Sequence, residues 1–161
     1  MSSSGAAEQA STGRIVLGVD CSPSSEQGLS CAVDQGGLPG QPVHAYISWE
    51  FPFSDGVGAL TAFDWEGSSA DILRATATKV LGEDGARLVT QHVVRGHPVP
   101  ALLEASADAA LAVVGSRGYG GFAGMLLGSV SRQVTAHARP VVVVHAPATD
   151  HGLTGDAGGG A

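Results

Sequence analysis

The residues best suited to chemistry are gathered in one stretch, VVGSRGYGGFAGMLLGSVSRQ, which contains Gly115, Gly118, Gly128 and Ser129. This glycine stretch begins on an apolar run and ends in a segment with helical spacing. Glycine permits positive φ and lets an anion approach backbone N–H groups, while a helix N-terminus adds unpaired donors and about half a positive charge. The combination indicates a backbone site for phosphate.

Spacing separates this stretch from an ordinary surface turn. Two glycines alone would fit such a turn, but the pattern G-x-x-G, nine residues and then G-S stands between a predicted strand and a predicted helix. Arg117 is the only cation between Gly115 and Gly128, and no lysine precedes Ser129. The stretch is therefore not the G-x-x-x-x-G-K-S/T phosphate loop, and G-x-G-x-x-G is absent from the first strand-helix turn. A phosphorylated ligand is the first hypothesis.

The elements that must position this stretch follow from the apolar pattern. Short runs rich in valine and isoleucine alternate with longer segments of helical spacing, which is typical of a parallel α/β sheet. Ligands in such sheets bind beyond the carboxyl ends of the strands, where the chain order reverses, and the glycine stretch follows the fourth strand. We predict strands at 14–19, 43–49, 87–94, 111–114 and 141–145, and helices at 22–36, 69–81, 101–107 and after 128.

The connection at 50–67 has an unusual composition. It contains one proline and several large rings, which could cover a bound nucleotide or pack on the sheet edge, and packing is the simpler expectation. In the helix that follows, Ile72, Thr76 and Val80 recur at i, i+4 and i+8 and predict its buried face. The rings of the connection are Phe51, Phe53, Phe63 and Trp65.

Length and charge limit the classes of function. The 161 residues suit one domain, which we expect at 13–146 between disordered tails at 1–12 and 147–161. A formal charge of −7 gives no electrostatic case for nucleic acid or an anionic membrane, so a phosphate site must be local. The N-terminus lacks a signal peptide's apolar core, and no run approaches the roughly 18 apolar residues of a membrane span. We expect a cytoplasmic protein.

Neither the cysteines nor the histidines form a recognisable catalytic or metal site. Cys21 and Cys31 show no ligand spacing and are expected to fill the core. The six histidines are scattered, and each is expected to be a surface or structural residue. His97 falls on the ligand side of the sheet, but the sequence offers it no partner. No G-x-S-x-G elbow occurs.

Further motifs extend beyond the glycine stretch. They are IVLGVDCSPSSEQGLSCAV near the start, RGHPVPALLEAS before the fourth strand, and RPVVVVH at the end. Together with the G-x-x-G, nine residues, G-S pattern, they resemble the nucleotide-binding branch of the universal stress protein family over about residues 13–146. The resemblance implies an open, Rossmann-like α/β sheet of five parallel strands in the order 3-2-1-4-5, with helices on both faces. It also implies an adenine nucleotide in the cleft and a dimer.

The resemblance assigns the phosphate end of this cleft to the glycine stretch. Gly115, Arg117 and Gly118 would line the ribose and phosphate path. Gly128, Ser129 and Val130 would bind the phosphates through the start of the last helix. The small residues between Gly118 and Gly128 suggest a loop that becomes ordered when a ligand or partner is present.

The other end of the cleft would be formed by the first two strands. Asp20 corresponds to the family's aspartate at the adenine and ribose end, although without the resemblance it is more simply a strand-end cap. Gly18 and Val19 would form the wall beside it, and Ser48 would offer backbone groups to the adenine edge.

These patterns favour a binding protein over an enzyme. We expect ATP, with or without Mg²⁺, to control a regulatory or sensory module in a stress response, with AMP, ADP or cyclic AMP as alternative ligands. A slow ATPase in the same cleft and a nucleotide-free interaction protein remain open. The valine run Val141, Val142, Val143 and Val144 would lie at a sheet edge and pair with a second copy. The stress and the partner are not named by the sequence.

Overall fold

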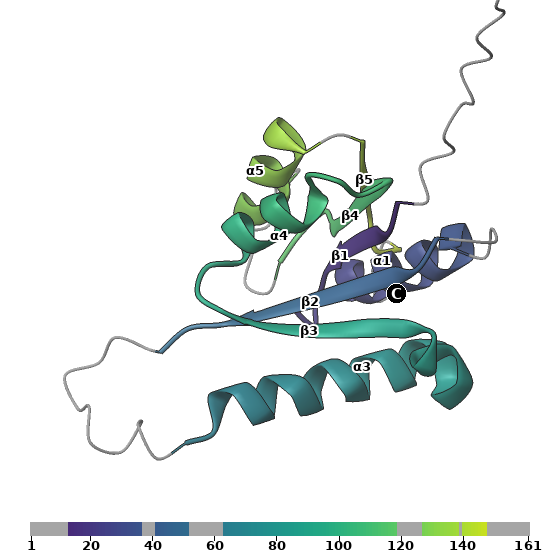
Figure 1. Cartoon of the computed structure of the whole chain (residues 1–161), viewed down its shortest axis with the longest axis vertical. Coiled ribbons are helices and arrows are strands. Elements are labelled where there is room, and N and C mark those ends of the chain that lie inside the picture. Colours follow the sequence, from purple (N-terminus) through teal and green to yellow (C-terminus); the bar gives the residue numbers. More distant parts are fainter. Residues whose placement is uncertain (1–12, 37–40, 52–62, 119–126, 139, 148–161) are drawn as a thin grey trace, which may run out of the picture.

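The computed structural model describes residues 13–36, 41–51, 63–118, 127–138 and 140–147. In these residues strands and helices alternate along the chain (Figure 1). The predicted tails lie outside the described residues, apart from residue 147. The elements are β1 (Ile15–Gly18), α1 (Pro23–Gly36), β2 (Val43–Trp49), α3 (Trp65–Arg87), β3 (Val89–Arg95), α4 (Pro98–Ser106), β4 (Leu111–Gly115), α5 (Ser129–His137) and β5 (Val141–Val144).

The strands form one parallel sheet in the order β3-β2-β1-β4-β5. Strand β1 lies at the centre, with Ile15 opposite Val43 of β2 on one side and Leu111 of β4 on the other. The chain order reverses between β1 and β4, so their carboxyl ends diverge into separate loops. The predicted fold class and strand order are confirmed.

Helices cover both faces of this sheet, as Figure 1 shows. Side chains alternate between the two faces of β1. Ile15 and Leu17 therefore lie in a core shared with α1 and α3, while Val16 packs against α4 and α5. All three side chains are almost fully buried. Burial on both faces explains why the central strands consist of continuous apolar runs.

Helix α3 begins four residues before the predicted start at Ser69. The Asp64 side chain accepts a hydrogen bond from the Gly67 N–H at 2.8 Å, which caps the earlier turn. The predicted buried face is wrong at one position: Ile72 is 43% exposed and Leu73 points into the core instead, whereas Thr76 is buried and Val80 packs partly buried against the core. The helix continues past the predicted end through a kink at Gly82, where φ is +73°.

The other boundaries differ from the predictions by small amounts. Helix α4 starts at Pro98, earlier than predicted, because the His97 ring accepts a hydrogen bond from the Val99 N–H and proline suits the first turn. His97 is thus a helix cap, in line with the expected structural role. The third strand starts at Val89, two residues late, because α3 occupies the preceding residues.

Candidate functional site

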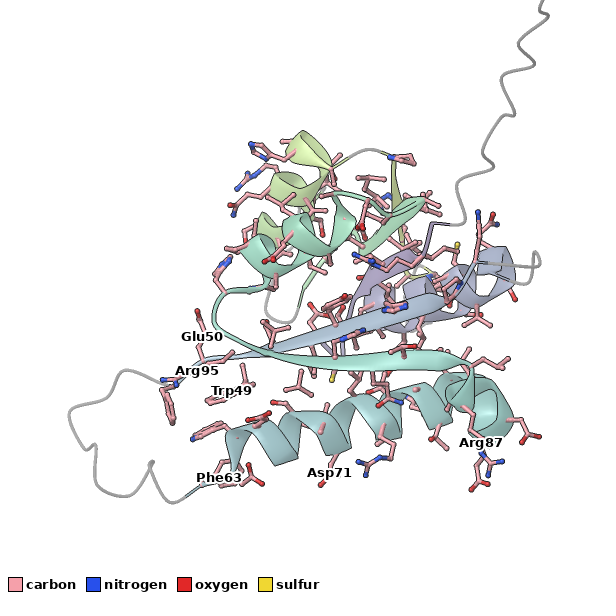
Figure 2. All side chains as sticks on the ribbon, viewed as in Figure 1. Trp49, Glu50, Phe63, Asp71, Arg87 and Arg95 are labelled. Atoms are coloured by element: carbon pink, nitrogen blue, oxygen red, sulfur yellow. The ribbon has the colours of Figure 1, made fainter. Side chains whose placement is uncertain are left out.

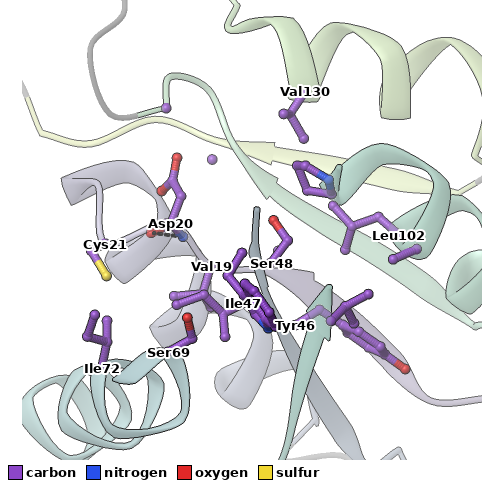
Figure 3. A pocket seen from close by; sticks show the side chains of 18 of the residues that line it. Val19, Asp20, Cys21, Tyr46, Ile47, Ser48, Ser69, Ile72, Leu102 and Val130 are labelled. Carbon is purple, nitrogen blue, oxygen red and sulfur yellow. Dashed lines mark hydrogen bonds between the residues drawn. The ribbon is translucent and has the colours of Figure 1, made fainter. Parts of the chain in front are cut away.

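A cavity of about 540 Å³ opens at the carboxyl ends of β1, β2 and β4 (Figure 3). Its volume lies in the range of small-molecule sites. The ten residues that the sequence assigned to a ligand all line it, although their roles toward a ligand stay predictions. They are Gly18, Val19, Asp20, Ser48, Gly115, Arg117, Gly118, Gly128, Ser129 and Val130.

One end of the cavity is formed by the start of α5. Gly128 is the N-cap residue, with φ −67° and ψ 166°, and no side chain in the described part of the chain caps this helix. The first N–H groups of a helix lack intrahelical partners, so those after Gly128 are available to an anion. The exposed Ser129 adds a hydroxyl, and Arg117 adds the positive charge of its guanidinium nearby.

The three glycines of the motif are closely packed, and Gly115 is the most tightly enclosed. A Cβ on Gly115 would lie 2.5 Å from Ser24 Oγ, and one on Gly118 would lie 2.9 Å from Asp20 Oδ2. A Cβ on Gly128 would lie 3.2 Å from the Gly118 nitrogen. Among the described glycines only Gly82 and Gly96, which lie outside the motif, have positive φ. None of the three motif glycines therefore has positive φ, and what restricts their side chains is contact with other parts of the chain; the approach of an anion to their N–H groups stays a prediction.

Hydrogen bonds tie the loop after β4 to α1 and α5. The Ser24 hydroxyl donates to the Arg117 carbonyl at 2.6 Å. The Arg117 N–H in turn donates to Ser24 Oγ at 3.3 Å. The Ser131 hydroxyl donates to the Gly115 carbonyl, and the Gly128 N–H donates to the Ser116 carbonyl at 2.7 Å. These contacts hold both ends of the glycine stretch in place. The predicted ordering of 119–126 lies outside the described residues.

Asp20 follows β1 and caps the turn into α1. Its Oδ1 accepts from the Ser22 N–H at 3.0 Å and from the Ser22 hydroxyl. Its Oδ2 is the oxygen closest to the position of a Cβ on Gly118. The carboxylate therefore acts as a strand-end cap and also borders the cavity, so the two roles considered for it are compatible.

The far end of the cavity contains residues that the sequence reasoning did not assign. Val19 donates its N–H to the Tyr46 carbonyl at 2.9 Å, which sets β1 beside β2 at the floor. Beyond it lie the first turns of α3, where Ser69 and Ile72 line the cavity. The prediction placed both residues in the helix but gave neither a ligand role, and it left 65–67 in the connection. The signal that could have moved the predicted helix start is the cap residue Asp64.

The aromatic residues of the connection divide between the two predicted roles. Phe63 and Trp65 line the cavity, and their ring centroids lie 4.6 Å apart. Phe51 packs on Trp49 at the sheet edge, and the Arg95 guanidinium lies over both rings (Figure 2). Phe53 lies outside the described residues.

Potential metal ligands and histidines are not clustered at the cavity in the described part of the chain. Among the described residues, no group of three or more His, Cys, Asp or Glu side chains could hold a metal ion. No histidine of the described part of the chain lines the cavity. Cys21 and Cys31 are free, and both are partly exposed, so the expectation that they fill the core is wrong. No helix in the described part of the chain is both long and apolar enough to span a bilayer.

Comparison with known proteins identifies the family. The sequence model of the Universal stress protein family matches residues 12–145. The chain belongs to the universal stress protein family. A universal stress protein of Mycobacterium tuberculosis is 35% identical over 138 residues, which are 81% of this chain and 44% of that protein. One from Mycolicibacterium smegmatis is 38% identical over 137 residues, covering 81% of this chain and 45% of that protein. The chain spans less than half the length of these curated universal stress proteins.

Solved universal stress protein structures share the fold. The protein UspA from Lactobacillus plantarum matches with a TM-score of 0.67 at 18% identity, covering 84% of this chain and 99% of that one. A universal stress protein solved in complex with cAMP matches with a TM-score of 0.60 at 25% identity, covering 84% and 98%. One from Archaeoglobus fulgidus in complex with dAMP matches with a TM-score of 0.53 at 24% identity, covering 81% and 96%.

Proposed function

We propose that this universal stress protein domain binds an adenine nucleotide, with ATP as the first candidate, and acts as a nucleotide-dependent regulatory module in a stress response. The observation that carries the proposal is the uncapped start of α5, which faces a cavity lined by Gly115, Gly118 and Gly128. Backbone donors at a helix N-terminus favour an anion, and three N–H groups can serve a polyphosphate.

A cyclic mononucleotide is the second candidate. The solved universal stress protein with cAMP shares 25% of its aligned residues with this chain. A cyclic monophosphate would use the same N–H donors at Ser129 and Val130. The additional phosphates of ATP would extend toward Arg117, which lies on the same loop. Arg117 therefore favours ATP over cyclic AMP in the proposal.

The proposed class is binding, and a resident metal does not fit the site. Asp20 and Glu50 are the two described carboxylates that line the cavity, and Asp20 Oδ1 already accepts two hydrogen bonds from Ser22. Any Mg²⁺ would therefore enter with ATP and be held mainly by its phosphates. Hydrolysis would require a base positioned beside the terminal phosphate, and no described histidine lines the cavity.

Calorimetry with a glycine variant tests the proposal. We expect wild-type protein to bind ATP, and Gly128→Val to weaken that binding at least about tenfold, or 1.4 kcal/mol. The reason is that an added Cβ at position 128 would lie 3.2 Å from the Gly118 nitrogen. The two further methyl groups of valine would displace the loop from the N–H donors at the start of α5. Titration of AMP, ADP and cyclic AMP into the same preparation ranks the candidate ligands.

The matched control is Gln133→Ala, which changes an exposed side chain on the same helix outside the cavity. It should bind ATP as the wild type does. Mass analysis of nucleotide released from freshly purified, denatured protein identifies any ligand already bound. Absence of released nucleotide, together with no heat of binding for any of the four nucleotides, would contradict the proposal.

We also propose that the unit at 13–146 dimerises through β5. Within the described residues β5 pairs only with β4, so its outer edge is open to another strand. Val142 on this strand is 37% exposed. An antiparallel pairing of two β5 strands would satisfy the open backbone groups of both copies.

A further inference from the structure

We propose that the first turns of α3 form the subsite for the planar base, with Ser69 contacting the polar edge of the base and Trp65 packing on its face. This assignment rests on the proposed function and deepens it, because it fixes which way a nucleotide lies in the cavity. It also adds two residues outside the glycine stretch that would select the ligand.

Ser69 is a largely buried residue whose hydroxyl borders the cavity. The residue is only 8% exposed, it lines the cavity, and Figure 3 shows its side chain directed from α3 toward Val19 and Ile47. No hydrogen bond joins its hydroxyl to another described residue. A hydroxyl that borders the cavity without a protein partner can bond to a ligand atom, and such a hydrogen bond contributes about 0.5–1.5 kcal/mol.

Other helical hydroxyls of the chain show how unusual Ser69 is. Thr76, Ser106 and Thr135 each donate to the carbonyl four residues earlier, at 2.8, 2.5 and 2.5 Å. Thr76 lies on the same buried side of α3 as Ser69. The local helix therefore satisfies a hydroxyl where the core surrounds it, while the hydroxyl that borders the cavity is left for another partner.

The surroundings of Ser69 suit a flat, largely apolar group. Phe63 and Trp65 stand at the mouth with their rings inclined by 64°. Phe63 is 52% exposed and Ile72 is 43% exposed, although both are large apolar residues. Exposed apolar side chains gathered at a cavity indicate a binding surface, and an aromatic ring favours stacking on a heterocycle.

The two ends of the cavity thus differ in chemistry. The α5 end offers backbone N–H groups and Arg117, which suit phosphates, whereas the α3 end offers rings and one hydroxyl. In Figure 3, Val130 and the α3 residues Ser69 and Ile72 lie on opposite sides of the cavity, with the end of β1 between them. A ligand with phosphates at one end and a planar heterocycle at the other matches both ends.

The first test replaces the hydroxyl alone. We expect Ser69→Ala to lower ATP affinity about tenfold by calorimetry and to leave the affinity for inorganic tripolyphosphate unchanged, since that ligand has no base. The matched control Thr78→Ala removes an exposed hydroxyl from the same helix outside the cavity and should bind both ligands as the wild type does.

The second test does not depend on Ser69. The chain has two tryptophans, so Trp49→Phe leaves Trp65 as the sole tryptophan. ATP should quench its fluorescence in this variant, and tripolyphosphate should not. ATP binding with no change in Trp65 emission and no loss in Ser69→Ala would overturn the base assignment while keeping the proposed function. Failure of the wild type to bind any nucleotide would overturn both.

Discussion

Gly115 shows how a single missing side chain shapes the site. Its Cα lies so close to the first turn of α1 that a Cβ would be 2.9 Å from the backbone of both Ser24 and Ser25. Backbone atoms of a packed helix cannot move aside as the end of a flexible side chain can. The residue therefore determines how closely β4 approaches α1.

We predict that Gly115→Ala lowers the free energy of unfolding by about 1–3 kcal/mol, the usual cost of overpacking. The comparison variant is Gly28→Ala, whose Cβ would meet the end of the Leu17 side chain at 3.3 Å. Alanine is also the better helix former by about 1 kcal/mol, so this change should be far smaller. Urea denaturation of both variants gives the measurement, and equal losses would refute the close-approach argument.

At the scale of single residues, the sequence predicted where the site glycines lie better than it predicted why glycine is needed there. The spacing of Gly115, Gly118 and Gly128 pointed to one site, and the structure brings all three to one cavity. Close approach could not be told from positive φ, because it depends on Asp20 and Ser24, which lie far away in the chain. Ser69 was missed because a serine within a helical pattern gives no sign of facing a cavity.

Strands β2 and β3 carry a pair of histidines away from the cavity. Tyr46 lies opposite His92 in the strand register, and His44 Nδ1 lies 2.9 Å from His92 Nε2 with the rings stacked at 5.0 Å. One nitrogen must donate and the other accept, so the bond requires at least one neutral ring. Burial lowers the pKa of both histidines, and the Arg14 charge lowers both further.

From the lowered pKa values of His44 and His92 we predict that the folded protein loses stability in acid. Because the folded pKa of each histidine is below its unfolded value of about 6.5, the unfolded chain takes up protons first. The stabilisation is present above about pH 6.5 and is lost as pH falls below it. Urea midpoints at pH 7.5 and 5.5 measure the loss. His92→Gln should reduce the difference, and the exposed His145→Gln should leave it unchanged; no reduction in the first variant would exclude the pair as its source.

Elements were predicted well where local residues define them. The valine and isoleucine runs identified every strand, and β2 has the predicted bounds. The start of α3 was misplaced because a single cap at Asp64 outweighs the apolar pattern that begins later. In the first turns Leu73 lies in the core in place of the predicted Ile72, while Thr76 is buried as predicted.

At the scale of the whole molecule, the sheet ends in an open edge at β5. We predict a dimer with twice the 16.0 kDa mass of one chain in sedimentation equilibrium at micromolar concentration. Val142→Lys should shift the equilibrium to monomer, because a charge at the pairing edge resists burial. Leu88→Lys, which alters a 73% exposed side chain between α3 and β3, should stay dimeric. A monomeric wild type would rule out this assembly.

The strand order is a property that periodicity does not encode. Apolar spacing indicates five buried strands but fits several orders, and the order was obtained through resemblance to the universal stress protein family. The match over residues 12–145 explains why that resemblance succeeded. The aromatic end of the cavity, in contrast, depends on where α3 starts and was left open between two roles.

The contact between Ser24 and Arg117 joins positions 93 apart in the chain. Neither half of the chain can assemble the cavity alone, because its walls come from both sides of the chain reversal between β1 and β4. The cavity therefore requires both halves of the sheet, and a ligand bound there would stabilise the folded chain as a whole.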